Sequence, residues 1–420
     1  MVTIPGALRG AAPWQRNLFV VLLAQAVTVM GFSFVFPFVP LYVQELGVEG
    51  PARAALWSGI AGSAMGLSLF VTGPVWGIVG DRYGRKANML RALFGSAVLT
   101  AATAFVPTVE GLVVMRFLTG MVSGVFATSL ALVASQTPRE RMGFSMGLLQ
   151  MATFLGNTIG PIVGGALGDA IGFRQTFSVA GAVRGACGLL VLLLVHEEFH
   201  RPRDLDGRRP LGFLRDFAHM ATSRQVLPVL ALLFVVQVTP VIMFPVLPVF
   251  IQSLSAGITS GTATGLAFAT LGVSSALSAL VVARVADRWG PRRIMVSCAL
   301  LAGVFHLPAL AVQTVWQVIP LVALLGLFNG GMLATTNTLV GVAVPREQHG
   351  RAFGAVQSAN SLAFGMGPLV GGALATAIGL RQVFLVNGLA FLLTGLVAHR
   401  LLARREGAHQ AEQAARRATV

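Results

Sequence analysis

The chain has 420 residues, of which 55% are hydrophobic and only 11% are charged, and its mean hydropathy is +0.78. Soluble proteins are about one quarter charged, so this composition excludes an ordinary soluble fold and predicts an integral membrane protein. The net charge of +15 would suit a nucleic-acid-binding protein, but the basic residues gather in alternate loops between apolar stretches, which argues against that function.

A membrane-spanning helix needs about 20 consecutive apolar residues, and we find twelve stretches of the chain that meet this requirement. In chain order they are expected near residues 17–42, 56–80, 88–106, 111–136, 143–168, 175–195, 226–251, 262–283, 294–313, 316–344, 352–378 and 382–401. All are far longer than the strands of about 10 residues that build outer-membrane barrels. The predicted fold is therefore an all-α integral membrane protein with twelve transmembrane helices.

The charges in the loops predict the orientation of these helices. Basic residues such as Arg82, Arg85 and Arg404 lie on the side of the membrane that also holds both termini. By the positive-inside rule that side is the cytoplasm, so we expect a multi-pass protein of the bacterial cell inner membrane with both termini cytoplasmic. We expect no removable signal peptide before the first span. Cys187 and Cys298 fall inside predicted helices and are expected to be packing residues, not a disulfide.

The second half of the chain repeats the first. Pro138-Arg139-Glu140 recurs 207 residues later as Pro345-Arg346-Glu347, and Gly160-Pro161 recurs at the same offset as Gly367-Pro368. Further matches, at offsets of 206 to 208, pair Asp81 with Asp287, Pro37 with Pro245, and Pro40 with Pro248. Each half is therefore expected to hold six helices in the same order.

Two six-helix repeats with an even number of spans share one orientation, so an axis along the membrane normal relates them and the transport path lies at their interface. We expect an N-terminal six-helix bundle over residues 1–195 and a C-terminal six-helix bundle over 226–402. A polar cytoplasmic linker over 196–225 joins them, with a possible short surface helix at 211–220, and a frayed cytoplasmic tail occupies 403–420.

Glycines and charges gather in the loop between the second and third spans. The loop contains Gly77, Asp81, Arg82, Gly84, Arg85 and Lys86. A degenerate copy between the eighth and ninth spans contains Asp287, Arg288 and Gly290. Both resemble the loop signature of the major facilitator superfamily, and with the internal repeat the resemblance extends over essentially the whole chain.

The resemblance implies that Asp81 and Arg85 form a latch that favours the outward-facing state. Asp81 would face the positive N-terminal end of the helix that starts near Arg351, and Asp287 would face the fifth span in the same way. Gly77 and Gly80 would let the second span approach its neighbour closely. The alternative is a loop of solvated charges that only orients the helices.

The fifth span carries a glycine and proline pattern. Its members are Gly156, Gly160, Pro161, Gly164 and Gly165. The pattern resembles the signature of the twelve-span drug:proton antiporter family. Proline cannot donate a backbone hydrogen bond, so it kinks the helix, while the glycines permit close packing. Because the eleventh span repeats the pattern, packing without any bearing on transport direction is the alternative.

Proton coupling requires a group in the pathway that binds and releases protons. No Asp or Glu lies at mid-depth in any predicted span, so our candidates are Arg116, Glu45 and Asp81. Arg116 begins a segment that resembles a family element in which a buried arginine is linked to proton transfer, with a structural pairing as the alternative. His306 is expected to be merely accommodated inside its helix.

The pathway is expected to be lined by apolar, adaptable side chains and a few amides. The cavity candidates are Gln25, Met30, Phe32, Phe36, Gln150, Asn157, Gln237, Met243, Asn337, Gln357 and Asn360, joined by Phe244 and Phe268. Such a lining suits neutral, lipophilic or weakly charged molecules. Packing between helices or against lipid is the alternative for each aromatic residue. Arg184 could attract an anion, or it could snorkel or form a structural pair.

The expected function is export of small lipophilic compounds, such as drugs, across the inner membrane by alternating access, in exchange for protons. The alternative is a facilitator-type carrier for a sugar, amino acid or other metabolite, and a non-transporting membrane sensor is a third class. We find no nucleotide-binding loop, metal-ligand cluster or nucleophile triad, so we expect no enzyme activity, no cofactor and no metal. The expected partners are the substrate, protons and membrane lipid, without nucleic acid or an obligatory protein partner.

Overall fold

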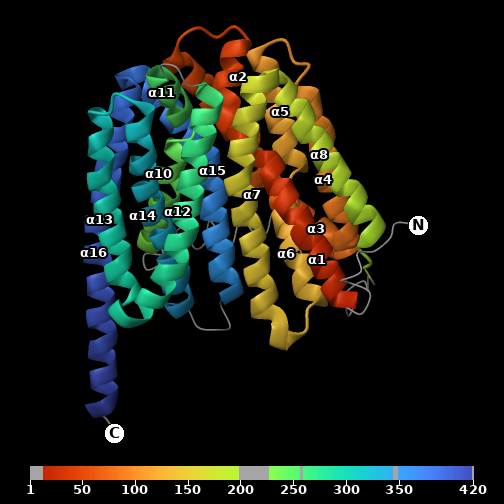
Figure 1. Cartoon of the computed structure of the whole chain (residues 1–420). Helices are drawn as coiled ribbons and strands as arrows, with labels where there is room; N and C mark the ends of the chain where they lie inside the picture. Colours follow the sequence, from red (N-terminus) through yellow and green to blue (C-terminus); the bar gives the residue numbers. More distant parts are fainter. Residues whose placement is uncertain (1–12, 198–226, 256–258, 344–348, 419–420) are drawn as a thin grey trace.

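The computed structural model describes residues 13–197, 227–255, 259–343 and 349–418, and within these ranges the chain is helical without strands. The first half consists of α1 (Pro13–Ser33), η2 (Phe36–Phe38), α2 (Val39–Glu45), α3 (Pro51–Tyr83), α4 (Arg85–Thr103), α5 (Val109–Val122), α6 (Val125–Gln136), η3 (Arg139–Arg141), α7 (Met142–Ile171) and α8 (Phe173–Leu194). The second half consists of α10 (Leu227–Ile242), α11 (Val246–Leu254), α12 (Ser260–Trp289), α13 (Pro291–His306), η4 (Leu307–Leu310), α14 (Val315–Ala343), α15 (His349–Ile378) and α16 (Leu380–Ala418). The halves stand side by side as two helical bundles (Figure 1).

These helices form the twelve predicted spans. In the described ranges, ten helical stretches are long and apolar enough to cross a membrane. The third span in chain order is α4, whose first two turns carry the charges of Arg85, Lys86 and Arg91. The fourth span in chain order is the stretch predicted at 111–136. The structure divides it into α5 and α6, each of which is too short to cross the membrane alone. The twelve-helix, two-repeat fold is confirmed.

Three spans predicted as continuous helices are interrupted. The stretches predicted at 17–42 and 226–251 each break before their last turns, at η2 and between α10 and α11. Both breaks fall beside the repeated proline pairs, because proline lacks the N–H that continues the helical ladder. The third break, between α5 and α6, has no proline and turns at Gly124, whose φ is +129°, a conformation that favours glycine.

Side chains from neighbouring helices satisfy the backbone at this third break. The indole Nε1 of Trp76 donates to the carbonyl of Met121, and the guanidinium Nη1 of Arg91 donates to the carbonyl of Val122 at 2.8 Å. The guanidinium carbon of Arg91 also lies 3.4 Å from the centroid of the Trp76 ring, a cation–π arrangement. The carbonyls that the end of α5 leaves without helical partners are therefore bonded.

The tail prediction needs correction. The structure continues α16 without interruption to Ala418, whereas we expected a frayed tail over 403–420. The segment is rich in alanine, arginine and glutamine, which are strong helix formers. The linker after Glu197 and the surface helix predicted at 211–220 lie outside the described residues.

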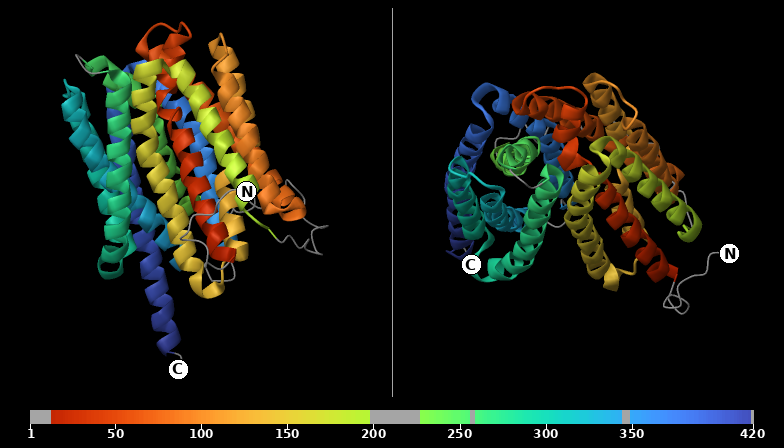
Figure 2. Two further views of the ribbon diagram at one scale, coloured as in Figure 1. Left: turned by 45° about the vertical axis from the view of Figure 1, so that its right-hand side comes forward. Right: turned by 45° about the horizontal axis from the view of Figure 1, so that its top comes forward.

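We call the end of the molecule where α1 begins and α16 ends the lower end, and the other the upper end (Figure 1). The halves pack through α3 against α15 and through α7 against α12 (Figure 2). From mid-depth to the upper end these helices touch: a Cβ on Gly66 would lie 2.6 Å from the Cα of Gly365, and one on Gly261 would lie 2.7 Å from the Gly165 carbonyl oxygen. Such approaches are possible only between small residues.

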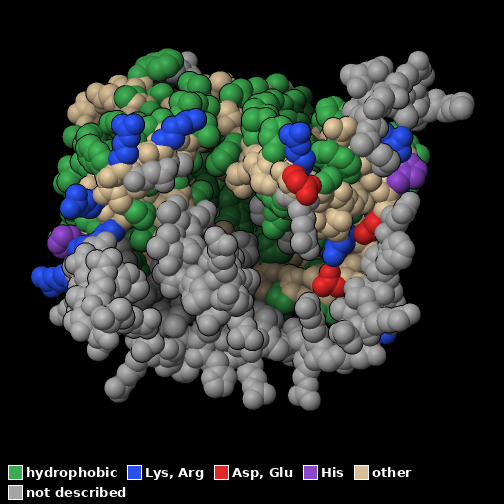
Figure 3. Space-filling view, turned by 90° about the horizontal axis from the view of Figure 1, so that it is seen from below, with side chains coloured by type: hydrophobic (Ala, Val, Ile, Leu, Met, Phe, Trp, Pro, Cys, Tyr) green, Lys and Arg blue, Asp and Glu red, His purple; other side chains and the backbone are tan. Residues whose placement is uncertain are grey.

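Toward the lower end the same helices separate. Within the described part of the chain, a Cβ on Gly73 or Gly77 of α3, or on Gly143 or Gly147 of α7, would meet nothing within 4 Å. Seen from below, the space-filling surface has a recess between the two halves whose visible wall is largely hydrophobic (Figure 3). The central path is therefore closed at the upper end and open at the lower end.

Candidate functional site

Five phenylalanines from both halves meet between the bundles, and we name them the phenylalanine cluster. They are Phe32 of α1, Phe36 of η2, Phe244 between α10 and α11, Phe268 of α12 and Phe364 of α15. The ring of Phe36 is central, with centroid distances of 4.7 Å to Phe32, 5.2 Å to Phe364 and 5.3 Å to Phe244, and Phe268 lies 5.7 Å from Phe244. Sequence analysis named four of these residues together and missed Phe364.

The broken first and seventh spans create this cluster. Phe36 and Phe244 lie in the interruptions between helices, where the chain departs from the helical path and turns its side chains toward the other half. A Cβ on Gly62 would touch Pro368 at 3.2 Å and the Phe36 ring at 4.0 Å. The cluster thus lies directly beside the upper contact between α3 and α15.

Polar residues of α7 extend this surface toward the lower end. Gln150 and Asn157 are exposed and share one helix face with Pro161, whose carbonyl touches Gly265 of the other half. The amide oxygen of Asn157 accepts a hydrogen bond of 2.8 Å from the Ser33 hydroxyl. Two of the predicted amides are therefore directed at the path between the halves.

The other predicted cavity residues are placed differently. Gln25 is only 1% exposed and donates to the Thr153 hydroxyl at 3.2 Å, so it joins α1 to α7 inside the first half and does not line the path as we expected. Met30 and Met243 are partly buried against the central hydrophobic core, Gln237 is half-buried and Asn360 is exposed. The side chains of Asn337 and Gln357 lie outside the described residues.

The glycines of the fifth span contact two different helices, α1 and α12. A Cβ on Gly156 would lie 2.6 Å from the Ala26 carbonyl oxygen, and Gly160 and Gly164 also face α1. Pro161 and Gly165 instead face α12 in the other half. The pattern therefore serves both the internal packing of the first half and its contact with the second.

Polar contacts also cross between the halves near the upper end. Gln44 and Gln252 are 208 residues apart, the same offset as the repeated prolines, and their amides donate to each other at 2.8 and 3.1 Å. Equivalent residues can pair in this reciprocal way only on the pseudo-twofold axis. On the side of α7 and α12, the carboxylate of Asp169 accepts from the backbone N–H groups of Gly261 and Thr262 at 3.0 and 2.6 Å and from the Thr262 hydroxyl at 2.6 Å.

The charged loop between α3 and α4 is held within the first half. Asp81 Oδ1 lies 3.9 Å from Arg85 Nη2, and Lys86 Nζ donates to the Leu192 carbonyl at 2.9 Å. Gly84 turns with φ of +104°, and Arg82 lies near the Tyr83 ring. A Cβ on Gly80 would lie 2.9 Å from Asn88 Nδ2, whereas one on Gly77 would meet none of the described residues within 4 Å, so the close approach expected at Gly77 stays a prediction.

Glu197, which we had assigned only to the linker, caps α4. Its carboxylate accepts from the backbone N–H groups of Arg85 and Lys86 at 3.0 and 2.7 Å. In the degenerate copy of the loop, Gly290 turns with φ of +83° and Arg288 closes α12, while the side chain of Asp287 lies outside the described residues. The side chains at the start of α15 also lie outside them, so the latch between Asp81 and α15 stays a prediction.

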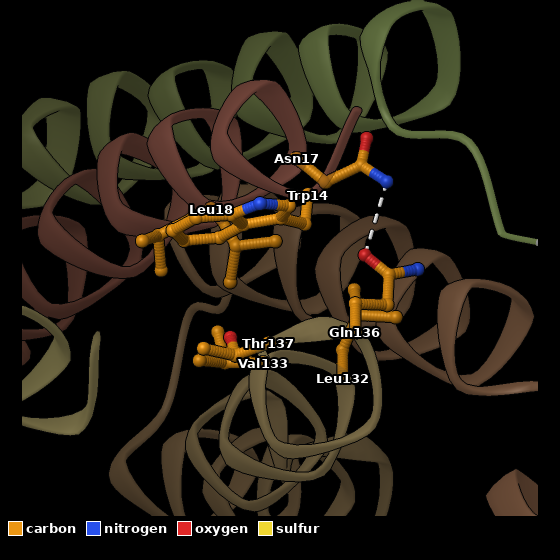
Figure 4. A pocket seen from close by; sticks show the side chains of 8 residues that line it. Trp14, Asn17, Leu18, Leu132, Val133, Gln136 and Thr137 are labelled. Atoms are coloured by element: carbon orange, nitrogen blue, oxygen red, sulfur yellow. Dashed lines mark hydrogen bonds between the residues drawn. The ribbon is translucent and has the colours of Figure 1, made fainter. Parts of the chain in front are cut away.

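A small pocket lies at the lower end of the first half, where α1, α6 and the end of α8 meet. It lies between Trp14, Asn17 and Leu18 of α1 and the end of α6 (Figure 4). The Asn17 amide donates to the Gln136 amide oxygen at 3.0 Å and to the His196 carbonyl at 2.6 Å. These bonds tie α1 and α6 to the end of α8.

Glu45 also caps a helix. Its carboxylate accepts from the backbone N–H groups of Phe173 and Arg174 at the start of α8, at 3.1 and 3.2 Å. A carboxylate at a helix N-terminus satisfies free N–H groups and complements the helix dipole. Glu45 therefore has a structural contact inside the first half, at the upper end.

Arg116 and Arg184 are buried in the first half, each only 4% exposed. The Arg116 guanidinium lies 5.0 Å from the Phe177 ring centroid, and its Nε and Nη2 atoms have no hydrogen-bond partner among the described residues. Arg184 Nη1 donates to the Thr100 hydroxyl at 2.9 Å. Arg184 thus does not snorkel, and its contact is a structural one between α8 and α4.

His306 occupies the corresponding region of the second half. Its Nδ1 lies 2.7 Å from the Ala302 carbonyl oxygen and its Nε2 lies 3.0 Å from the Asn387 amide. With a carbonyl to accept one ring N–H and an amide to donate to the other nitrogen, the neutral ring has both partners. His306 is accommodated, as expected.

Two helical repeats that close around a shared path at one end and open at the other have the architecture of an alternating-access transporter. The Major Facilitator Superfamily model matches residues 21–262 and 244–419, and the chain belongs to this family.

Individual relatives agree with this assignment. Multidrug resistance protein MdtG of Serratia proteamaculans is 32% identical over 393 residues, covering 93% of this chain and 95% of the relative. MdtG of a Rahnella species is 32% identical over 402 residues, covering 95% and 96%. Among solved structures, a bacterial homologue of the human lysosomal transporter Spinster, inward-facing and unoccupied, has a TM-score of 0.77 at 14% identity, covering 94% of this chain and 98% of that one.

Proposed function

We propose that the chain exports small lipophilic compounds across the inner membrane in exchange for protons, by alternating access. The observation that carries the proposal is the phenylalanine cluster, which presents aromatic rings from both halves to the path between them. Full-length similarity to proteins named for multidrug resistance supports the same substrate class.

The lower end is the cytoplasmic side in this proposal, because the basic loop between α3 and α4, the start of α1 and the end of α16 lie there. The path is then open to the cytoplasm, and the molecule is in the state that receives substrate from inside. The boundaries follow: residues 1–195 and 226–402 rock as two bodies, 196–225 is the cytoplasmic linker, and 403–420 is the cytoplasmic tail, in which α16 continues to Ala418.

The chemistry of the cluster selects the substrate. Its five members are aromatic, and the nearest polar groups named along the path are amides such as Gln150 and Asn157. Aromatic and amide groups bind neutral or weakly charged lipophilic molecules, since a fully charged ligand would lose its hydration without a counter-charge. Arg116 and Arg184 are buried inside the first half and do not supply one.

Proton coupling is assigned to Arg116, Glu45 and Asp81. Arg116 is a buried cation whose Nε and Nη2 atoms have no hydrogen-bond partner among the described residues, so it responds strongly to any nearby change of charge. Asp81 moves toward α15 when the lower end closes, and its latch stabilises the outward-facing state. The latch depends on the charge of Asp81, because a helix N-terminus attracts a carboxylate more strongly than a neutral side chain.

The test is proton movement in proteoliposomes that contain a pH dye and receive a panel of lipophilic drugs, sugars and amino acids. We expect drug-dependent proton movement that is lost in Arg116→Ala or Asp81→Asn. Phe36→Ala removes an aromatic contact worth about 0.5–1.5 kcal/mol, which raises the apparent KM for drugs up to about tenfold.

Phe105→Ala is the matched control, because Phe105 is 79% exposed and lies away from the cluster; it should leave drug exchange unchanged. A response to one sugar or amino acid without any response to drugs would overturn the proposal and favour a metabolite carrier.

A further inference from the structure

Asn157 and Phe364 occupy equivalent positions of the two halves. They are 207 residues apart, the offset that relates the halves, and lie on α7 and α15. The Phe364 ring belongs to the phenylalanine cluster and stacks on Phe36 at a centroid distance of 5.2 Å. Asn157 instead presents an exposed amide halfway along α7. One wall of the path is therefore aromatic at this depth, and the wall that the pseudo-twofold axis relates to it is polar.

The residues on either side of Asn157 contact two different helices. A Cβ on Gly156 would lie 2.6 Å from the Ala26 carbonyl oxygen of α1, and a Cβ on Gly272 of α12 would lie 3.2 Å from Thr158 Oγ1. Successive residues of a helix are turned by about 100°, so the side chain between them leaves α7 in the sector between α1 and α12. That sector faces the path, because both helices contribute rings to the phenylalanine cluster.

A hydrogen bond to Ser33 fixes the orientation of this amide. The Ser33 hydroxyl, at the end of α1, donates to Asn157 Oδ1 at 2.8 Å, and Ser33 is only 5% exposed. With the amide reversed, this buried hydroxyl would lose the one acceptor that it has among the described residues. A Cβ on Gly160 would lie 2.5 Å from Ser33 Cβ, so α1 and α7 are already in close contact beside the pair. The Asn157 Nδ2 group therefore points away from Ser33, and it has no hydrogen-bond partner among the described residues.

The free donor and the aromatic rings are close enough to meet one ligand. Ser33 directly follows Phe32, whose ring lies 4.7 Å from that of Phe36. Consecutive Cα atoms are about 3.8 Å apart, so the polar pair and the phenylalanine cluster adjoin at the end of α1. A drug-sized molecule can therefore stack on the rings and reach the amide at the same time.

We propose that Asn157 donates a hydrogen bond to the substrate, and that the substrates are uncharged aromatic compounds with a hydrogen-bond acceptor, such as a carbonyl oxygen, at the edge of the ring system. The inference deepens the proposed function and rests on it. The substrate rings pack on the phenylalanine cluster, while the acceptor takes the Asn157 N–H in place of water. A compound without an acceptor displaces that water and leaves the N–H unbonded, so it binds less tightly. Ser33 is a positioning residue, because it acts through the amide.

Three rigid tricyclic probes test the direction of this hydrogen bond. Fluorenone carries a carbonyl acceptor, fluorene a CH2 group and carbazole an N–H donor at the same position of nearly the same skeleton. Scintillation proximity with radiolabelled probes measures each Kd for the full chain in detergent. The ratios of these Kd values are compared between the parent and its variants, so that the different lipophilicities of the probes cancel.

Asn157→Leu should lower the ratio of the fluorene Kd to the fluorenone Kd about two- to tenfold, as for the loss of one neutral hydrogen bond. The ratio of the fluorene Kd to the carbazole Kd should stay the same, because a donor gains nothing from an N–H. Asn157→Met, also apolar and of similar size, should behave alike and replaces the leucine variant if that one fails to fold. A fluorenone ratio that stays unchanged, a carbazole ratio that falls instead, or a parent that binds none of the three probes would overturn the proposal.

Ser33→Ala tests the positioning role. The amide keeps its donor but is free to turn and present its oxygen, so carbazole should bind at least about twofold more tightly relative to fluorene. A merely structural residue would not improve the binding of a donor. Equal weakening of all three probes would overturn the fixed orientation of the amide.

Two controls separate this donor from its surroundings. Phe364→Ala removes a ring, so it should raise all three Kd values about two- to tenfold and keep their ratios. Gln175→Leu removes an exposed amide in the first turn of α8 at the upper end, and it should change no Kd. A fluorenone ratio that falls as far in Gln175→Leu as in Asn157→Leu would also overturn the donor site.

Drug-driven proton movement in proteoliposomes is measured on the same variants. Fluorenone selectivity that depends on Asn157, in a chain that moves no drug, overturns the proposed function and leaves the donor site standing. Drug exchange by a chain whose fluorenone ratio is indifferent to Asn157 overturns the donor site alone.

Discussion

The reciprocal amide pair on the pseudo-twofold axis leads to a quantitative prediction. Gln44 and Gln252 are half-buried, and their two hydrogen bonds, at 2.8 and 3.1 Å, have good lengths. A neutral hydrogen bond contributes about 0.5–1.5 kcal/mol, and neither amide is fully withdrawn from water. We therefore expect the pair to stabilise the closed upper end of the path, the upper gate, by about 1–2 kcal/mol.

A double-mutant cycle isolates this contribution. The open fraction of the upper gate is measured by the distance between spin labels at Glu49 and Ala311, exposed upper-end residues of the first and second halves, with Cys187→Ala and Cys298→Ala as background. It is compared for the parent, Gln44→Ala, Gln252→Ala and the double variant. Each single change should raise the ratio of open to closed gates, and the double change should raise it no more than either alone. The expected coupling energy is about 1–2 kcal/mol, whereas independent sites add within about 0.3–0.5 kcal/mol. Additive single effects would refute the axial pairing.

Two further predictions concern packing and capping. Gly66→Val should push α3 away from α15, because even a Cβ at Gly66 would lie 2.6 Å from the Cα of Gly365. This overpacking should cost about 1–3 kcal/mol and raise the open upper population. Gly73→Val is the control and should not change that population, because a Cβ there meets no described residue within 4 Å. Glu197→Gln should weaken the cap of α4 by about 0.5–2 kcal/mol and lower the Tm in detergent, whereas the exposed Glu140→Gln should not. A Tm equal to that of the parent would show that the Glu197 cap contributes nothing.

Three carboxylates share one structural role that the sequence did not reveal. Glu45, Asp169 and Glu197 each bind two successive backbone N–H groups at the start of another helix. A helix begins with backbone N–H groups that have no partner within the helix, and few charges are present to satisfy them in a chain with only 11% charged residues. These three acidic residues therefore cap the starts of helices. Of the three, Asp169 alone caps a helix of the other half.

Some functional residues could have been found from the sequence and others could not. Phe364 is the repeat equivalent of Asn157, so the offset of 207 that located Gly367-Pro368 also pointed to it. No pattern in the sequence indicated that Gln25 is buried between α1 and α7. A membrane helix is apolar on all sides, so its sequence does not reveal which face contacts lipid, the path or another helix.

The amino-acid sequence alone determined that the chain crosses the membrane in twelve helices arranged as two repeats. Those properties depend on apolar length, local proline and glycine positions, and a constant offset, all of which are written along the chain. The tertiary structure decided which rings form the phenylalanine cluster, which helix each carboxylate caps, and which end of the path is closed. These depend on contacts between residues that are more than 90 positions apart, such as Asp169 with Gly261 at one upper seam and Gly372 with Ala55 at the other. These contacts must also separate when the path opens at the upper end. Helical periodicity is the same whether the path is closed or open there, so it cannot specify these contacts.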